Sequence, residues 1–155
     1  MKYDGIDGEA TQQDHKKWID CTSISWGAAR NIDNTTGVGT NREASEPRVS
    51  DVTITKTMDA ASPKLFTEAC AGNQGKDVKI ELTTTGSPSI VYCVYTLKNA
   101  IVSSYSVNSS STERPSESVG ISFTNMEIKF TSFDDKNIAG SPVTASYDVA
   151  STKKG

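Results

Sequence analysis

The sequence predicts a mainly β protein with one short α-helix at about residues 63–71, and three observations support this fold class. Apolar and polar residues alternate with a period of two through much of the chain, which is typical of half-buried strands. One stretch departs from this pattern and carries the signals of a helix start and end. In the last long apolar stretch, the apolar residues change from odd-numbered to even-numbered positions. This change indicates a bent strand, which is useful for closing a barrel.

The first clear strand is expected over residues 51–58. Val52, Ile54 and Met58 alternate there with polar residues, and Lys56 interrupts the apolar face once. Further along, residues 78–82 repeat the same alternation. This pattern predicts strands with one buried face and one polar face.

The helix is expected between these two strands. Ser62 is a suitable cap, Pro63 occupies the first helical position and Gly72 ends the segment, which together are typical helix boundary signals. We expect one apolar face toward the sheet, formed by Leu65, Phe66, Ala69 and Cys70.

Two apolar stretches in the middle of the chain predict further strands. Residues 90–97 are apolar on both faces, so this strand is expected in the middle of the architecture, covered on both sides. Residues 101–107 form the next predicted strand, separated from it by the polar step Lys98–Asn99. The Ser-rich segment 108–118 is expected to be a loop.

The last long apolar stretch changes parity around Thr124 and Asn125. Its apolar residues fall first on odd and then on even positions: Val119, Ile121 and Phe123, followed by Met126, Ile128 and Phe130. One extra residue in a strand exchanges its two faces and sharpens its bend. The pattern therefore predicts a β-bulge at this point.

Composition limits the class of protein. With 155 residues and 35% hydrophobic content, we expect a single domain over 1–155. The 16 basic and 19 acidic residues are scattered and leave a net charge of −3, which argues against a nucleic-acid partner. The sequence contains neither an apolar run of roughly 20 residues nor a leader-like start. We therefore expect no membrane insertion and no Sec export, and we expect the protein to fold in the cytosol.

Catalytic and metal sites are not expected. His15 is the only histidine, and its charged surroundings read as a solvated loop, which argues against a nucleophilic triad. The three cysteines, Cys21, Cys70 and Cys93, are too far apart for a zinc site, and buried structural thiols are favoured. We therefore predict no enzyme, no cofactor and no metal.

Two further features are candidates for function. The segment Arg30–Ser50 has few large apolar residues and no sustained period, and a loop of this length is usually either functional or disordered. On an extended strand from Trp18 to Trp26, the two tryptophans and Ile24 would share the core face. The opposite face would present Ile19, Cys21, Ser23 and Ser25, and the two serines would line whatever that face encloses.

Several motifs, taken in order, resemble one family. Lys2-Tyr3-Asp4-Gly5-Ile6-Asp7-Gly8-Glu9, His15-Lys16-Lys17-Trp18-Ile19 and Ser25-Trp26-Gly27 resemble the N-terminal signature of the Hcp (haemolysin-coregulated) proteins, tail-tube subunits of bacterial type VI secretion systems. Similar likenesses are found at 51–59 with 62–65, at 91–105 and at 117–130. The resemblance covers nearly the whole chain.

This resemblance implies a β-barrel of two packed antiparallel sheets with one flanking helix. It further implies homohexameric rings that stack into a tube inside a contractile sheath, carry a spike protein and hold effector proteins in the channel. Such a protein would be located in the bacterial cytoplasm until the secretion system contracts. It would then be secreted, or enter a target cell, without a Sec signal peptide. A missing leader agrees with that route.

The resemblance also assigns roles to the candidate residues. The charged residues of the long loop at about 30–50 would fix ring stacking, namely Arg30, Arg42, Glu43, Glu46 and Arg48. Ser23 and Ser25 would face the channel. The alternative is a secreted β-barrel binding module for carbohydrate or adhesion, which would be monomeric and expose an aromatic patch.

Overall fold

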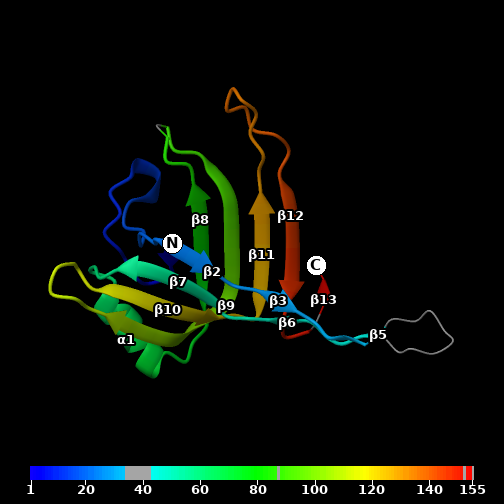
Figure 1. Cartoon of the computed structure of the whole chain (residues 1–155), viewed down its shortest axis with the longest axis horizontal. Coiled ribbons are helices and arrows are strands. Elements are labelled where there is room, and N and C mark those ends of the chain that lie inside the picture. Colours follow the sequence, from blue (N-terminus) through cyan, green and yellow to red (C-terminus); the bar gives the residue numbers. More distant parts are fainter. Residues whose placement is uncertain (34–42, 87, 152, 155) are drawn as a thin grey trace.

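The computed structural model describes residues 1–33, 43–86, 88–151 and 153–154, with the side chains of 33, 43, 44, 153 and 154 left out. The fold is mainly β with one α-helix, as predicted (Figure 1). The elements are β1 (Lys2–Tyr3), a 3-10 turn η1 (Gln13–His15), β2 (Ser23–Ser25), β3 (Ala28–Ala29), β4 (Ile32–Asp33), β5 (Glu43–Ala44), β6 (Arg48–Val49), β7 (Val52–Thr57), α1 (Ser62–Ala71), β8 (Lys76–Thr83), β9 (Val91–Asn108), β10 (Ser116–Ser122), β11 (Asn125–Phe130), β12 (Val143–Asp148) and β13 (Lys153–Lys154).

The strand β9 organises the fold. Its first part pairs with β8 and β11, and its last part pairs with β10. The sequence predicted two strands separated at Lys98–Asn99, whereas the structure has one strand of 18 residues that bends there. Asn99 has a φ of 51°, in the left-handed region that asparagine tolerates better than most residues. The polar step marks a corner within one strand and not a gap between two.

Two antiparallel sheets share β9. The upper sheet in Figure 1 contains β1, β8, β9, β11, β12 and β13, and the lower sheet contains β9, β10, β7 and β2. The prediction of two packed antiparallel sheets is confirmed. Within the described residues, however, the lower sheet ends at β2 and the upper sheet ends at β1 and β13, so the sheets pack together without closing into a barrel.

The parity change near Thr124 has another cause than the predicted bulge. The chain leaves the lower sheet after β10 and enters the upper sheet as β11, and Phe123 and Thr124 form the connection. Because the two sheets face the core from opposite sides, the apolar positions change parity at the crossing. The bulge itself lies between Gly120 and Ile121, where β10 meets β9.

The helix α1 covers the lower sheet, as the predicted segment required, but its contacts differ from the expected ones. Leu65 is fully buried, while Phe66 is 54% exposed and Cys70 is exposed. Ser62 does not cap the helix, because its hydroxyl lies in a buried hydrogen-bond network. A Cβ on Gly72 would lie 2.5 Å from the Glu68 carbonyl oxygen, so the helix end has room only for glycine.

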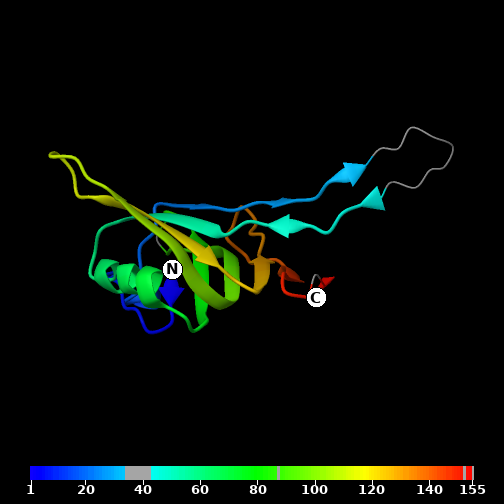
Figure 2. The same cartoon turned by 90° about the horizontal axis from the view of Figure 1, so that it is seen from below.

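The segment predicted as an unstructured loop is a two-stranded ribbon in its described parts. The strands β3 and β6 pair with each other, and so do β4 and β5. Figure 2 shows the ribbon extending far beyond the two sheets. Backbone pairing satisfies the polar groups that an isolated loop would leave to water, and the low apolar content of the segment hid this pairing from the sequence pattern.

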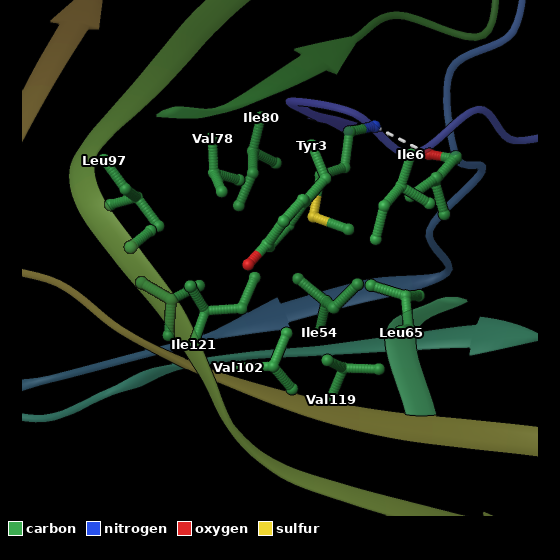
Figure 3. Packing of buried hydrophobic residues seen from close by; sticks show 14 of the residues in the cluster. Tyr3, Ile6, Ile54, Leu65, Val78, Ile80, Leu97, Val102, Val119 and Ile121 are labelled. Carbon is green, nitrogen blue, oxygen red and sulfur yellow. Dashed lines mark hydrogen bonds between the residues drawn. The ribbon is translucent and has the colours of Figure 1, made fainter. Parts of the chain in front are cut away.

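The core lies between the two sheets and α1 (Figure 3). Ile54, Leu65 and Leu97 are fully buried there, and Tyr3 reaches into the same cluster with only 1% exposure. The hydroxyl of Tyr3 is buried and has no hydrogen-bond partner among the described residues. Burial, with a smaller contribution from Glu68, raises the pKa of Tyr3 to about 12.

Replacing Tyr3 with Phe is expected to stabilise the protein by about 1 kcal/mol at neutral pH, because a buried unpaired hydroxyl costs free energy. Because the folded pKa of Tyr3 lies above its ordinary value of 10, ionisation of Tyr3 in the unfolded chain lowers the stability of the wild type as the pH rises from 10 toward 12, and Tyr3→Phe removes this loss. Urea unfolding at pH 7 and pH 11 checks both points. A loss of stability in Tyr3→Phe at pH 7 would contradict the expectation.

Candidate functional site

One face of the lower sheet consists of hydroxyl and amide side chains. The strands β2, β7, β10 and β9 pair in antiparallel register, so alternate residues on each strand point to the same side. Three cross-strand rows result: Ser25, Thr53, Gly120 and Ser104; Ser23, Thr55, Ser118 and Ser106; and Thr57, Ser116 and Asn108. We call these residues the hydroxyl face.

The bulge enlarges this face. At Gly120 the strand β9 supplies one residue more than β10, and a bulge of this kind turns two residues toward one partner. A Cβ placed on Gly120 would lie 2.3 Å from the Ser104 Oγ and 3.0 Å from the Ser103 Oγ. Both serine hydroxyls therefore lie over Gly120, and the absence of a side chain makes room for them.

The hydroxyl face has no charged side chain in its three rows. A carboxylate lies at its border, where the Ser103 hydroxyl donates a 2.6 Å hydrogen bond to Asp51 Oδ2. Neutral hydroxyls form individually weak, exchangeable hydrogen bonds with water or with a passing molecule. The surface is therefore polar without preferring either sign of charge.

The other side of the same sheet is buried. Ile54 and Val119 are fully buried, and Ser23 and Ser25 are exposed. Ser23 and Ser25 therefore point away from the core, as predicted. Their role in lining a channel stays a prediction. The single strand predicted from Trp18 to Trp26 is wrong in its first half, because β2 covers only Ser23–Ser25 and Ile19 belongs to the core.

A buried ionic network anchors α1 behind the hydroxyl face. Lys56 Nζ donates to Glu117 Oε2 at 2.9 Å and to Asp59 Oδ1 at 2.7 Å. Ser62 Oγ donates to Glu117 Oε2 at 2.8 Å, and the Tyr105 hydroxyl donates to Glu117 Oε1 at 2.7 Å. The interruption that Lys56 makes in its strand pattern was the only sequence signal for this network, and its partners could not be read from the sequence.

The network shifts the acidity of two members in opposite directions. Burial raises the pKa of Glu117, but hydrogen bonds from Lys56, Tyr105 and Ser62 outweigh it and hold the pKa below its ordinary value. Burial together with the Glu117 carboxylate raises the pKa of Tyr105 to about 12. Glu117 is therefore ionised and Tyr105 neutral over the physiological range.

His15 does not lie in a solvated loop, contrary to the sequence prediction. It is 9% exposed in η1, and its Nε2 lies 2.6 Å from Glu81 Oε2. The ring packs edge-on against Trp18 with centroids 4.6 Å apart, and Lys79 Nζ pairs with the other oxygen of Glu81. This cluster connects η1 to β8, and no hydroxyl or thiol nucleophile is hydrogen-bonded to His15 in the described residues.

The cysteines and the loop residues have mixed environments. Cys93 is buried and Cys21 half-buried, whereas the exposed Cys70 contradicts the expectation of buried thiols. On the ribbon, Arg30, Glu46 and Arg48 are exposed; Glu43 pairs through its backbone with Asp33, and Arg42 lies outside the described residues.

The described residues include no group of three or more His, Cys, Asp or Glu residues placed to hold a metal ion. The same part of the chain has no helix long and apolar enough to cross a membrane.

Comparison with known proteins identifies the family. The model of the family described as "Type VI secretion system effector, Hcp" matches residues 1–130. The chain belongs to the Hcp family. Among curated relatives, protein hcp1 of Pseudomonas aeruginosa is 27% identical over 132 residues, covering 84% of this chain and 80% of the relative.

Two solved structures of type VI secretion proteins superpose on nearly the whole chain. A structure of a type six secretion system protein superposes with a TM-score of 0.91 at 26% identity, covering 99% of this chain and 96% of the other. Hcp1 from Salmonella typhimurium gives a TM-score of 0.81 at 25% identity, with 99% and 95% covered. The Hcp resemblance seen in the sequence is thus confirmed, and the chain is a type VI secretion protein.

Proposed function

We propose that this Hcp protein is the tube subunit of a type VI secretion system. Six copies form a ring with the hydroxyl face lining the channel, and rings stack into the injected inner tube. The protein is located in the bacterial cytoplasm until the secretion system contracts, and it then leaves the cell with effector proteins in the channel. Its further partners are the spike protein and the contractile sheath, and it catalyses no reaction.

The observation that carries this proposal is the hydroxyl face. A channel that lets varied cargo pass needs a wet surface without strong charge, and three rows of neutral side chains provide one. The buried side of the same sheet and α1 give the wall its rigidity. The alternative of a carbohydrate-binding module has less support, because Trp18 and Trp26 are both partly buried and packed against His15 and Tyr95.

The ribbon supports ring stacking. It extends beyond the two sheets (Figure 2), and its exposed residues include both signs of charge, Arg30, Glu46 and Arg48. Charges of both signs can fix the register of two surfaces without giving high affinity. We assign the stacking role to these residues together with Arg42 and Glu43.

Negative-stain microscopy and light scattering test the proposal. The purified protein is expected to form particles with a central hole and a mass about six times that of the chain, as closed cyclic assemblies do. A variant with 30–48 replaced by a short turn, which removes all five of these charged residues, is expected to form single rings that no longer stack. A monomer at every concentration up to the millimolar range would refute the ring, and undiminished stacking in the shortened variant would refute the role of the ribbon.

A further inference from the structure

All but one of the large exposed apolar side chains of the described residues lie in two regions of the fold. The first, the helix cluster, consists of Met58, Phe66 and Val107; the second, the hairpin cluster, consists of Phe130, Ile138 and Val143. Among the described residues, Ile32 on the ribbon is the only large exposed apolar side chain outside these two clusters.

The helix cluster lies where α1 meets the ends of β7 and β9. Phe66 packs against Tyr105 with ring centroids 5.9 Å apart, and Val107 follows two residues later on the same side of β9. Met58 comes directly after β7, and its backbone N–H donates to the Pro115 carbonyl oxygen at the base of the β9–β10 turn. The three side chains, 36–54% exposed, continue the buried side of the lower sheet past its end.

The hairpin cluster lies on β11, on β12 and on the loop between them. Phe130 and Val143 are directly opposite each other in register, and Phe130 shares its side of β11 with the core residue Met126. Ile138 is held at the loop tip, since its N–H donates to Asp134 Oδ1 at 2.8 Å and its carbonyl oxygen accepts from the Asp134 N–H. An exposed isoleucine on a fixed turn is a preorganised contact.

The two clusters lie on different sides of the two sheets. Figure 1 places α1 and the turn between β9 and β10 at the lower left and the loop between β11 and β12 at the top. A ring requires a heterologous contact, in which one surface of each copy meets a different surface of the next. Two unlike apolar clusters on different sides meet this requirement, whereas a two-fold dimer would need only one.

Charges of both signs border both clusters. The exposed Lys64 and Arg114 lie near the helix cluster together with Glu9 and Glu113. On the hairpin, Asp134 and Asp135 are accompanied by Lys129 and Lys136. Mixed charges on both surfaces can fix the register in which the two clusters meet.

We propose that the hairpin cluster of one copy packs against the helix cluster of the next, a second copy of this chain. This inference rests on the proposed ring. Each cluster offers roughly 250 Å² of apolar side chain, well below the ~800 Å² per partner of a standard interface. The clusters are therefore the anchors of a larger contact, and a single contact is weak until the ring closes.

Two charge-adding variants test this pairing, with a matched control. Phe66→Asp disables the helix cluster and Val143→Asp the hairpin cluster; Gln74→Asp adds the same charge at an exposed position outside both. Because all three side chains are exposed, the variants are expected to fold, and only Phe66→Asp is expected to melt at a slightly lower temperature, since it loses the contact with Tyr105. Each cluster variant alone is expected to be monomeric, with ring assembly weakened at least tenfold, while Gln74→Asp forms rings.

Mixing the two cluster variants gives the decisive result. Phe66→Asp keeps its hairpin cluster and Val143→Asp its helix cluster, so one intact contact can form between unlike variants and none beyond it. At high concentration the equimolar mixture is expected to sediment toward a dimer and no further, while each variant alone remains monomeric.

Three outcomes would overturn the inference: rings from either cluster variant as in the wild type, dimers from one variant alone, or a mixture that stays monomeric. If wild type and Gln74→Asp are themselves monomeric throughout, the ring of the proposed function fails instead, and the two failures are thereby told apart.

Discussion

Lys56→Met is expected to lower the free energy of unfolding by about 3–5 kcal/mol, because removing one partner of a buried ion pair leaves an uncompensated charge in the core. Lys56 is fully buried and holds the carboxylates of Glu117 and Asp59. Without the ammonium, Glu117 keeps only the hydroxyls of Ser62 and Tyr105. Urea unfolding of the variant and the wild type at pH 7 measures the loss.

The double variant Lys56→Met with Glu117→Leu is the matched control. It removes the Lys56–Glu117 pair and leaves only Asp59, at the edge of the network, without its ammonium partner. The double variant is therefore expected to recover part of the stability that the single variant loses. A single variant within about 1 kcal/mol of the wild type would show that the network contributes little.

The same network gives a pH dependence with a definite sign. The folded pKa of Glu117 lies below its ordinary value of 4.5, so its contribution is fully present above pH 4.5 and is lost as the pH falls through the folded pKa. In Lys56→Met the hydrogen bond and charge that lower the pKa are gone. The stability of the variant is therefore expected to fall less steeply below pH 4.5 than that of the wild type.

Gly8→Ala is expected to destabilise the protein by about 2–3 kcal/mol through overpacking. A Cβ at Gly8 would lie 2.3 Å from the carbonyl oxygen of Trp18 and 2.7 Å from the Cα of Ile19. Both are backbone atoms, and the Gly8 N–H also donates to the Lys17 carbonyl oxygen, so the two segments cannot separate cheaply. Thermal unfolding measures the effect.

Gly27→Ala is the control for this substitution. A Cβ at Gly27 meets no heavy atom within 4 Å, so the same chemical change is expected to alter stability by less than about 0.5 kcal/mol. Equal melting temperatures for the two variants would show that the close approach at Gly8 relaxes without cost.

The helix and most strands could be predicted from the sequence because they depend on local signals. Pro63 and Gly72 bounded α1 closely, and the alternation at 51–58 located β7. Errors arose where distant segments decide the environment. His15 has charged neighbours in sequence, yet Glu81 and Trp18 bury it, and Phe66 has an apolar helix position that the sheet does not cover.

The candidate site was predictable only in part. Ser23 and Ser25 were selected from their parity on a short strand, which local alternation determines. Their assembly with Thr53, Ser118 and Ser106 into one surface depends on strand order and register. A register shift of one residue would turn a strand's side chains to the opposite face of the sheet.

By itself, the sequence determined the β character, the place of the single helix and, through its ordered motifs, the Hcp family, because alternation, capping residues and motif order are properties of neighbours along the chain. Only the tertiary structure decided that the sheets share the bent β9 without closing, that Lys56 meets Glu117 and that neutral side chains gather on one face. These features are set by contacts between residues far apart in sequence, and it is packing of the whole core that selects one such set of contacts.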